Sequence, residues 1–321
     1  MKEIGFKSIQ FLLILLSCST QIVAQDNNAA IIHLKVLRMN DTYIDVYHNK
    51  PEGKDKLPLL IFCQGSGYDS NTEGVLGLFR QFKNKAVGIA IEKQGVQLGD
   101  KGDTLKEEYK LNNMVYNRLY DYLRVFQYLR ANATWWNGDV YVIGGSEGGL
   151  LAGMLACYYP TVKAVAIFSF GGGLNFGEAW PVSSGLQKKA ASATSTEIES
   201  EIKSVQDSLK EIHNNPGFVK SYSGEDNTYA WWNSIMDLRL QNALLDLTIP
   251  IYVVQGTEDM MAPPVSAQKL NAAFIKQGKT NLFYKEYKGY DHEYKDSSNT
   301  SHLVQVVMDA TRWILDKNNN R

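Results

Sequence analysis

The chain has 321 residues, of which 44% are hydrophobic, so it can bury the core of one large domain or of two small ones. Its formal net charge is -1, from 33 basic and 34 acidic residues, and no run of Lys or Arg occurs. This balance disfavours nucleic acid and acidic membrane surfaces as partners, and it suits a small neutral substrate.

The first 24 residues have the pattern of a secretory signal peptide. Two lysines precede an apolar stretch at 9–18, and a polar segment ends in Ile-Val-Ala at 22–24. The stretch is shorter than the roughly 18 residues that cross a bilayer, so no membrane span is predicted. We expect cleavage after Ala24 and export to the periplasm or the medium. The alternative is a lipid anchor at Cys18, because LLSC at 15–18 resembles a bacterial lipoprotein signal.

Beyond the signal the sequence has two cysteines, Cys63 and Cys157. Their number and spacing predict neither a disulfide framework nor a metal site. Both fall in apolar segments, where a cysteine usually packs as a small hydrophobic residue. We therefore expect no cofactor and no metal.

The remaining residues, 25–321, predict a single domain that begins with two antiparallel edge strands. Ile31–Leu37 and Tyr43–Tyr47 alternate between apolar and polar side chains and are joined at Asn40-Asp41. Six later runs are short and apolar or β-branched, as in buried strands: Leu57–Cys63, Ala86–Ile91, Asp139–Ile143, Val162–Phe168, Pro250–Val254 and Asn281–Tyr287. Helical patterns occur at Leu111–Ala131, Ala267–Lys276 and His302–Asp316. This alternation predicts an α/β fold with a mostly parallel central sheet flanked by helices.

Two segments interrupt the alternation of strand and helix. Gln94–Asn113 is charged and aperiodic, which predicts a solvated loop or, alternatively, a lid. The second segment, between the strands ending near 168 and starting near 250, is far longer than usual connections and has a helical pattern at Thr196–His213. It predicts a helical cap over about 172–247. We expect most of its large aromatic residues to pack on the core, the alternative being that they line an acyl pocket: Trp180, Tyr229, Trp231 and Trp232.

A glycine-flanked serine lies between a predicted strand and a predicted helix. The residues GGSEGG at 144–149 follow the strand at 139–143 and precede an apolar run at 150–156. Strand, tight turn and helix with serine at the turn is the arrangement of a nucleophile elbow. A serine there needs strained backbone angles, and glycines let strand and helix approach closely. Ser146 is the predicted nucleophile.

A serine hydroxyl becomes a good nucleophile when an imidazole accepts its proton. The chain has only five histidines, and His33, His48 and His213 fall on the edge strands or at the end of the cap helix. His292 follows the last predicted strand, where its ring can reach the carboxyl edge of the sheet. It is the predicted base, and His302 is the alternative.

The imidazole in turn needs a carboxylate to fix its tautomer. The strand at 250–254 leads into QGTED at 255–259, and Asp259 fits better than Glu258 because the shorter side chain already lies at the tip of the loop. The alternative is that this acidic pair only caps a turn. Loops at the carboxyl ends of parallel strands gather at one crevice, so Ser146, Asp259 and His292 can meet.

Attack on a carbonyl also requires two donors for the oxygen that becomes negative. The backbone N–H of Glu147, at the start of the elbow helix, is one candidate. The loop CQGSGY at 63–68 follows a predicted strand, and the N–H of Ser66 is the second candidate. A plain glycine-rich turn is the alternative. Phosphate binding is disfavoured, because neither loop is followed by Lys-Ser/Thr.

In this order the motifs QGSG at 64–67, GGSEGG at 144–149, GTED at 256–259 and DH at 291–292 resemble those of the α/β-hydrolase superfamily, over about residues 30–318. The resemblance implies an α/β-hydrolase fold with a Ser146, Asp259 and His292 triad and an oxyanion hole at Ser66 and Glu147. One departure is Gln64, where many members have histidine.

The combined expectation is an exported serine hydrolase acting on a small acyl compound through an acyl-enzyme. A carboxylic ester is preferred over a peptide or amide bond, and a thioester is a further alternative. The competing class is a non-catalytic binding protein of the same fold. A binding module needs no serine, carboxylate and histidine together, so the three residues favour an enzyme.

Overall fold

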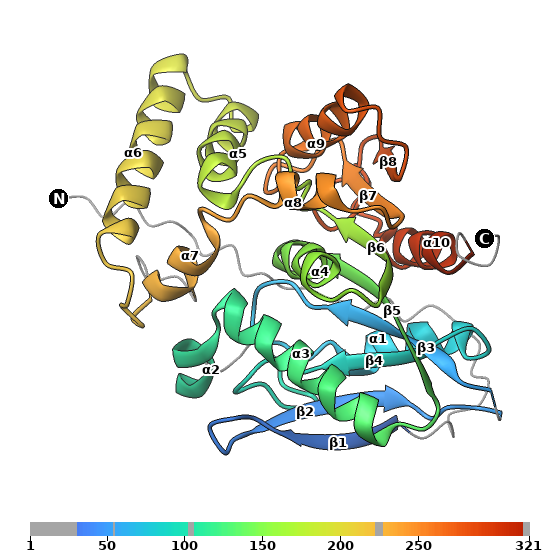
Figure 1. Ribbon diagram of the computed structural model, residues 1–321. Helices are drawn as coiled ribbons and strands as arrows, with labels where there is room; N and C mark the ends of the chain where they lie inside the picture. The colour runs from blue at the N-terminus through green and yellow to red at the C-terminus, as the bar shows by residue number, and fades with distance from the viewer. Residues whose placement is uncertain (1–30, 54, 102–105, 222–226, 317–321) are drawn as a thin grey trace.

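The computed structural model describes residues 31–53, 55–101, 106–221 and 227–316 (Figure 1). The predicted signal peptide and the alternative anchor at Cys18 lie outside these ranges. The described residues form an eight-stranded sheet in the order β1-β2-β4-β3-β5-β6-β7-β8. Its strands are β1 (Ile31–Leu37), β2 (Tyr43–Asn49), β3 (Leu57–Cys63), β4 (Val87–Ile91), β5 (Trp136–Gly145), β6 (Val162–Phe168), β7 (Ile251–Gly256) and β8 (Leu282–Tyr287).

Strand direction follows the hydrophobic pattern. The alternating strands β1 and β2 pair antiparallel with each other, and β2 pairs antiparallel with β4. From β4 to β8 every neighbouring pair is parallel. The uniformly apolar strands are thus those of the parallel part, where both faces are covered. The predicted mostly parallel sheet is confirmed.

Helices cover both faces of the sheet (Figure 1). The two largest apolar clusters lie one on each face. The larger core lies under α3 (Val115–Asn132), α4 (Glu147–Tyr158), α8 (Leu240–Asp246) and α9 (Pro264–Lys276). The opposite face carries α1 (Thr72–Phe79), followed by the 3-10 turn η1 (Arg80–Phe82), and α10 (Leu303–Asp316). The sheet therefore presents its carboxyl edge, rather than a face, to the loops that bear the candidate site.

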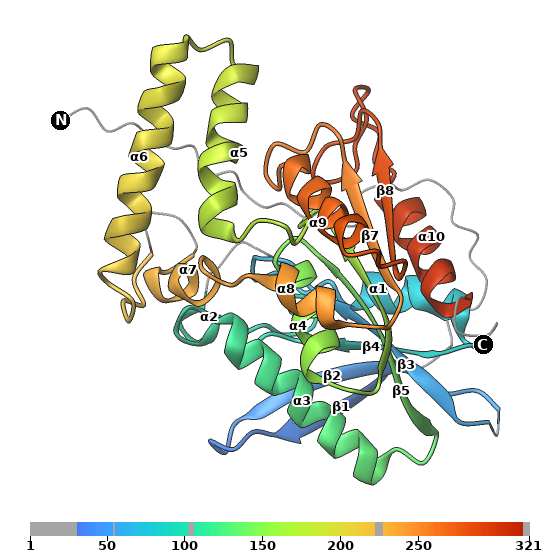
Figure 2. The ribbon, with the colours of Figure 1, turned by 45° about the horizontal axis from the view of Figure 1, so that its top comes forward.

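The long connection between β6 and β7 is helical, as expected. It contains α5 (Phe176–Ala190), α6 (Ser195–His213), α7 (Tyr229–Ile235) and α8. Figure 2 shows α5 and α6 side by side as a hairpin that projects from the sheet, with α7 at its base. Both helices of the hairpin begin with a capping box, Asn175 with Glu178 and Thr194 with Glu197, which satisfies backbone donors at each start.

The segment 94–113 is only partly the loop that its charge suggests. It ends in a short helix, α2 (Glu107–Asn112), so the expectation of a loop is wrong there, and the next helix begins at Val115 rather than at Leu111. The physical reason is Tyr109, whose side chain is buried and donates a hydrogen bond to the Gly67 carbonyl oxygen at 3.1 Å. A single buried aromatic residue thus fixes this turn of helix against the loop at 64–71 that follows β3, called the β3 loop below.

Both cysteines pack as expected. Cys63 is buried at the end of β3 and Cys157 is partly buried on α4, and both thiols are free. Burial raises the pKa of Cys63 to about 12 and that of Cys157 to about 11, so each stays protonated at neutral pH.

Within the described residues, no cluster of three or more His, Cys, Asp or Glu is arranged to hold a metal ion. Among the helices described, none combines the length and the apolar character that crossing a bilayer requires.

Candidate active site

Ser146 occupies the sharp turn between β5 and α4. Its backbone has φ 54° and ψ -127°, a strained conformation for a residue with a side chain. A Cβ on Gly144 would lie 2.0 Å from the Gly148 carbonyl oxygen, and one on Gly148 would lie 2.0 Å from the Cys63 carbonyl oxygen. The glycines thus permit the strand, the helix and the β3 loop to touch. The structure therefore has the strand, tight turn and helix that the sequence predicts around Ser146.

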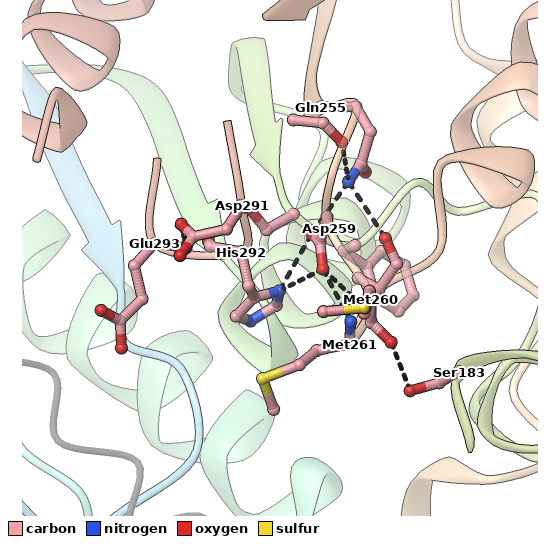
Figure 3. A network of polar contacts seen from close by, with 12 residues as sticks. Ser183, Gln255, Asp259, Met260, Met261, Asp291, His292 and Glu293 are labelled. Atoms are coloured by element: carbon pink, nitrogen blue, oxygen red, sulfur yellow. Dashed lines mark hydrogen bonds and ion pairs between the residues drawn. The ribbon is translucent and has the colours of Figure 1, made fainter. Parts of the chain in front are cut away.

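Asp259, which is buried, and His292, which is partly buried, form a hydrogen-bonded pair beside β7. The Nδ1 atom of His292 lies 3.0 Å from both carboxylate oxygens of Asp259, which has no exposed side-chain surface (Figure 3). The Asp259 carboxylate also accepts the backbone N–H groups of Met261 and Ala262 at 2.9 and 2.8 Å, and the side-chain amide of Gln255 at 2.9 Å. These donors fix the carboxylate, so an Nδ1–H directed at it leaves Nε2 as the basic nitrogen of the ring.

The end of β6 connects the elbow to the histidine loop. The Ser146 N–H donates to the Phe168 carbonyl oxygen at 2.9 Å. The next residue, Ser169, donates its hydroxyl to the His292 carbonyl oxygen at 3.0 Å, and its N–H to Val254 at 3.2 Å. The structure therefore brings all three predicted triad residues to the ends of the neighbouring strands β5 to β8, with Asp259 and His292 in direct contact.

The alternative base and acid are placed differently. His302 bonds Asp296 through Nε2 at 2.9 Å and stacks on Tyr290, with ring centroids 4.6 Å apart. It thus belongs to a surface turn. Glu258 is exposed beside the buried Asp259, and its carboxylate accepts a hydrogen bond from the Thr257 hydroxyl at 3.4 Å. Geometry favours His292 and Asp259.

Two opposed effects act on the pKa of His292, and their net result is a pKa above the ordinary value of 6.5. Burial alone lowers the pKa, because it penalises the charged ring. The charge of Asp259 and its hydrogen bond to the ring raise the pKa by more, with further help from Glu293 and Asp291. An imidazolium formed here is therefore stabilised.

The two predicted oxyanion-hole segments are joined by one buried guanidinium. Arg118 of α3 donates to the Glu147 carboxylate at 2.7 Å and to the Gln64 carbonyl oxygen at 2.5 Å. Arg118 is 4% exposed and Glu147 is fully buried. The close approach of Gly148 to the β3 loop places the backbone of Glu147 beside that loop. Ser66 and Glu147 thus lie on adjoining backbone segments.

The cap contacts both the elbow and the acid loop. The indole N–H of Trp231, on α7, donates to the second carboxylate oxygen of Glu147 at 3.1 Å. The hydroxyl of Ser183, on α5, donates to the Met260 carbonyl oxygen at 2.6 Å (Figure 3). The cap aromatics pack as expected: Trp180 and Trp232 stack with centroids 4.4 Å apart, and Trp231 and Trp232 are buried.

A groove of about 1140 Å³ runs between the cap hairpin and the acid loop. Its lining includes Asp259 and Met260 but neither Ser146 nor His292, so the groove borders the acid loop. Charged side chains of both signs also line it, Glu178, Glu258, Lys189 and Lys269. Most other lining residues are apolar: Leu174, Pro181, Val182, Leu186, Leu209, Pro263, Pro264 and Val265.

Several residues that shape the site have no counterpart in the sequence-based prediction. Arg118 lies on the buried side of α3 among Val115, Leu119 and Tyr122, and a charged residue at an apolar face position is the signal that could have revealed it. Glu92 and Lys93 directly follow the buried strand β4, where a charged pair at a carboxyl end is a comparable signal.

No family model matches the sequence, and no curated protein matches it. Solved structures do match. Est1E from Butyrivibrio proteoclasticus has a TM-score of 0.57 and 15% identity, over 90% of this chain and 99% of that one. The acylaminoacyl peptidase of Pyrococcus horikoshii has a TM-score of 0.59 and 13% identity, over 91% of this chain and 41% of the peptidase. Dipeptidyl peptidase 4 of Porphyromonas gingivalis has a TM-score of 0.57 and 14% identity, over 90% of this chain and 35% of the peptidase.

The chain therefore spans the whole of Est1E but only about two fifths or a third of these two peptidases. At identities of 13% to 15%, these structural matches show the fold alone. Together with the sheet order, the flanking helices and the serine at the β5–α4 turn, they establish that this chain has the α/β-hydrolase fold.

Proposed function

We propose that the protein is a serine hydrolase that cleaves a carboxylic ester through an acyl-enzyme on Ser146. The observation that carries this proposal is the contact of His292 with the buried Asp259 carboxylate, at the same sheet edge as a serine held in a strained turn. A site for binding alone has no use for a histidine oriented by a fully buried carboxylate. The same arrangement supplies each group that acyl transfer needs.

In the proposed reaction the Ser146 hydroxyl attacks the ester carbonyl while His292 accepts its proton at Nε2. Asp259 stabilises the imidazolium that forms. The N–H groups of Glu147 and Ser66 bind the oxygen that becomes negative. His292 then gives the proton to the leaving alcohol, and a water molecule, activated by the same imidazole, releases the acid from Ser146.

An ester is proposed before a peptide because of two observations. Est1E, which is matched over essentially its full length, has also been solved with ferulic acid, a carboxylic acid, bound to it. The apolar groove beside Asp259 would suit the hydrocarbon part of such a substrate. Amide and thioester cleavage remain outcomes of the test.

The test of this proposal combines a covalent probe with a substrate panel. A fluorophosphonate should label the protein once, and peptide mapping should find the label on Ser146. Among short esters, long esters, aminoacyl amides and acyl thioesters, we expect the highest kcat/KM for an ester. A protein that stays unlabelled and hydrolyses none of the four classes would be a binding protein, contrary to the proposal.

The raised pKa of His292 gives an expected pH dependence. The base must be neutral, so kcat/KM should rise with pH and reach half its maximum above pH 6.5. Glu293→Gln removes one of the charges that raise the pKa, and should move this midpoint to lower pH. Initial rates between about pH 5 and 9 measure both. A wild-type midpoint below 6.5, or a Glu293→Gln midpoint shifted upward, would contradict the assignment.

A further inference from the structure

Lys93 is a buried cation that the proposed mechanism does not use. It follows β4 by two residues and is 6% exposed. Its Nζ atom donates to the Gly65 carbonyl oxygen at 2.6 Å and also to the Gly67 carbonyl oxygen. One amino group thus holds the carbonyl on each side of Ser66. Such burial is costly for an ammonium, so its presence calls for a reason.

The covalent geometry of the loop links Lys93 to the Ser66 N–H. The Gly65 carbonyl and the Ser66 N–H belong to one peptide group, which is planar and trans, so that the two point in opposite directions. Holding the Gly65 oxygen at Nζ therefore directs the Ser66 N–H away from Lys93. The second contact, at Gly67, prevents the loop from turning about Ser66.

Neighbouring residues hold the rest of the same loop. The Tyr109 hydroxyl donates to the Gly67 oxygen at 3.1 Å. The Glu92 carboxylate accepts hydrogen bonds from the side chains of Gln64 at 3.3 Å, Ser70 at 2.5 Å and Thr72 at 2.6 Å. The two residues that follow β4 thus hydrogen-bond the loop from residue 64 to residue 72. Glu92 binds its two ends, and Lys93 binds its centre.

The contact does not depend on the charge of Lys93. Burial and, to a smaller extent, the charge of Arg118 lower the pKa of Lys93 to about 7, although the carboxylates of Glu147, Glu92 and Asp69 oppose the decrease. A neutral amine keeps two N–H groups, which is one for each carbonyl, so the geometry survives loss of the proton.

We propose that Lys93 is a positioning residue for the oxyanion hole: by binding the carbonyl oxygens on both sides of Ser66, it sets the direction of the Ser66 N–H. This inference rests on the proposed function and assigns a role that the triad does not include. Lys93 acts through the loop backbone and does not touch the substrate.

The test is Lys93→Met, which keeps the length of the side chain and removes its donors. The oxyanion exists only in the transition state, so kcat should fall by about 10- to 100-fold while KM stays within about threefold. A boronic acid that forms a tetrahedral adduct on Ser146 should bind more weakly by a similar factor. Lys85→Met, which removes an exposed lysine paired with Asp316, is the matched control and should leave all three values unchanged.

Near-ultraviolet circular dichroism reports whether Lys93→Met is folded. If Lys93→Met is not folded, Tyr109→Phe is the variant that tests the inference, because it removes one hydroxyl donor from the Gly67 oxygen and keeps the packed ring. We expect a several-fold lower kcat at unchanged KM for Tyr109→Phe. A folded Lys93→Met with wild-type kcat and boronate affinity, or a Tyr109→Phe with unchanged kcat in its place, overturns the inference while the wild-type enzyme still hydrolyses esters. An inactive, unlabelled wild type overturns the proposed function instead.

Discussion

Replacing Ser146 by alanine is expected to lower kcat for the best ester substrate by about 10⁶-fold, which corresponds to roughly 8 kcal/mol of activation free energy. The methyl group cannot form the acyl-enzyme, and only the oxyanion donors and substrate binding remain to accelerate the reaction. Fluorophosphonate labelling should disappear in the same variant. Initial-rate assays on purified protein, with Ser204→Ala on the exposed side of α6 as the control, measure the effect.

The same experiment also tests whether the triad works as a unit. His292→Ala alone should cost nearly as much as Ser146→Ala, and the double variant should be no slower than either single one. The reason is that a serine without its base, and a base without its serine, are each useless for acyl transfer. Ser146→Ala retaining more than about 1% of kcat, or a double variant in which the two losses multiply, would show that the residues act independently.

The parallel strands could be predicted from sequence because burial on both faces makes them uniformly apolar. Leu57–Cys63 and Val162–Phe168 have the predicted limits. Strand β7 continues beyond the predicted end through Gln255 and Gly256, since its backbone pairing with β8 continues past the apolar run. Polar and glycine residues at a strand end carry no hydrophobic signal, although there they place the Asp259 loop.

The cap was predictable as an insertion but not helix by helix. Helix α6 has a regular apolar stripe, whereas α5 contains Pro181 and Gly185, which argue against a helix. Tertiary packing of the hairpin outweighs these local preferences. The capping pair Asn175 and Glu178 is the local signal that marks the start of α5.

The candidate triad could be predicted because few residues could fill each role, with five histidines and a single serine elbow. The supporting charges could not, since sequence patterns place Lys and Arg at the surface by default. In α3 the apolar Leu123 is only partly buried, whereas the charged Arg118 is buried. The partners of Arg118 lie 29 and 54 residues away along the chain, so no local pattern indicates them.

Replacing Arg118 by methionine is expected to destabilise the protein by about 3–5 kcal/mol, because it leaves the buried Glu147 carboxylate without the guanidinium that pairs with it. The Gln64 carbonyl would lose a donor as well, so the β3 loop would loosen from the elbow. Urea denaturation gives the change in unfolding free energy. Lys203→Met breaks an exposed, solvent-screened pair with Asp207 and serves as the control, with no measurable change in stability expected.

A second substitution separates the buried charge from the shape of the site. Glu147→Gln keeps the length of the side chain and an acceptor for Trp231, but it removes the charge. In the wild type it should destabilise, because the Arg118 guanidinium loses its counterion; in the Arg118→Met background it should stabilise, because it removes the uncompensated carboxylate. The same substitution thus changes stability in opposite directions, and equal changes in the two backgrounds would mean that Arg118 and Glu147 are not coupled. Activity should stay low in the double variant, because restoring stability does not return the donor that Arg118 gives to the Gln64 carbonyl.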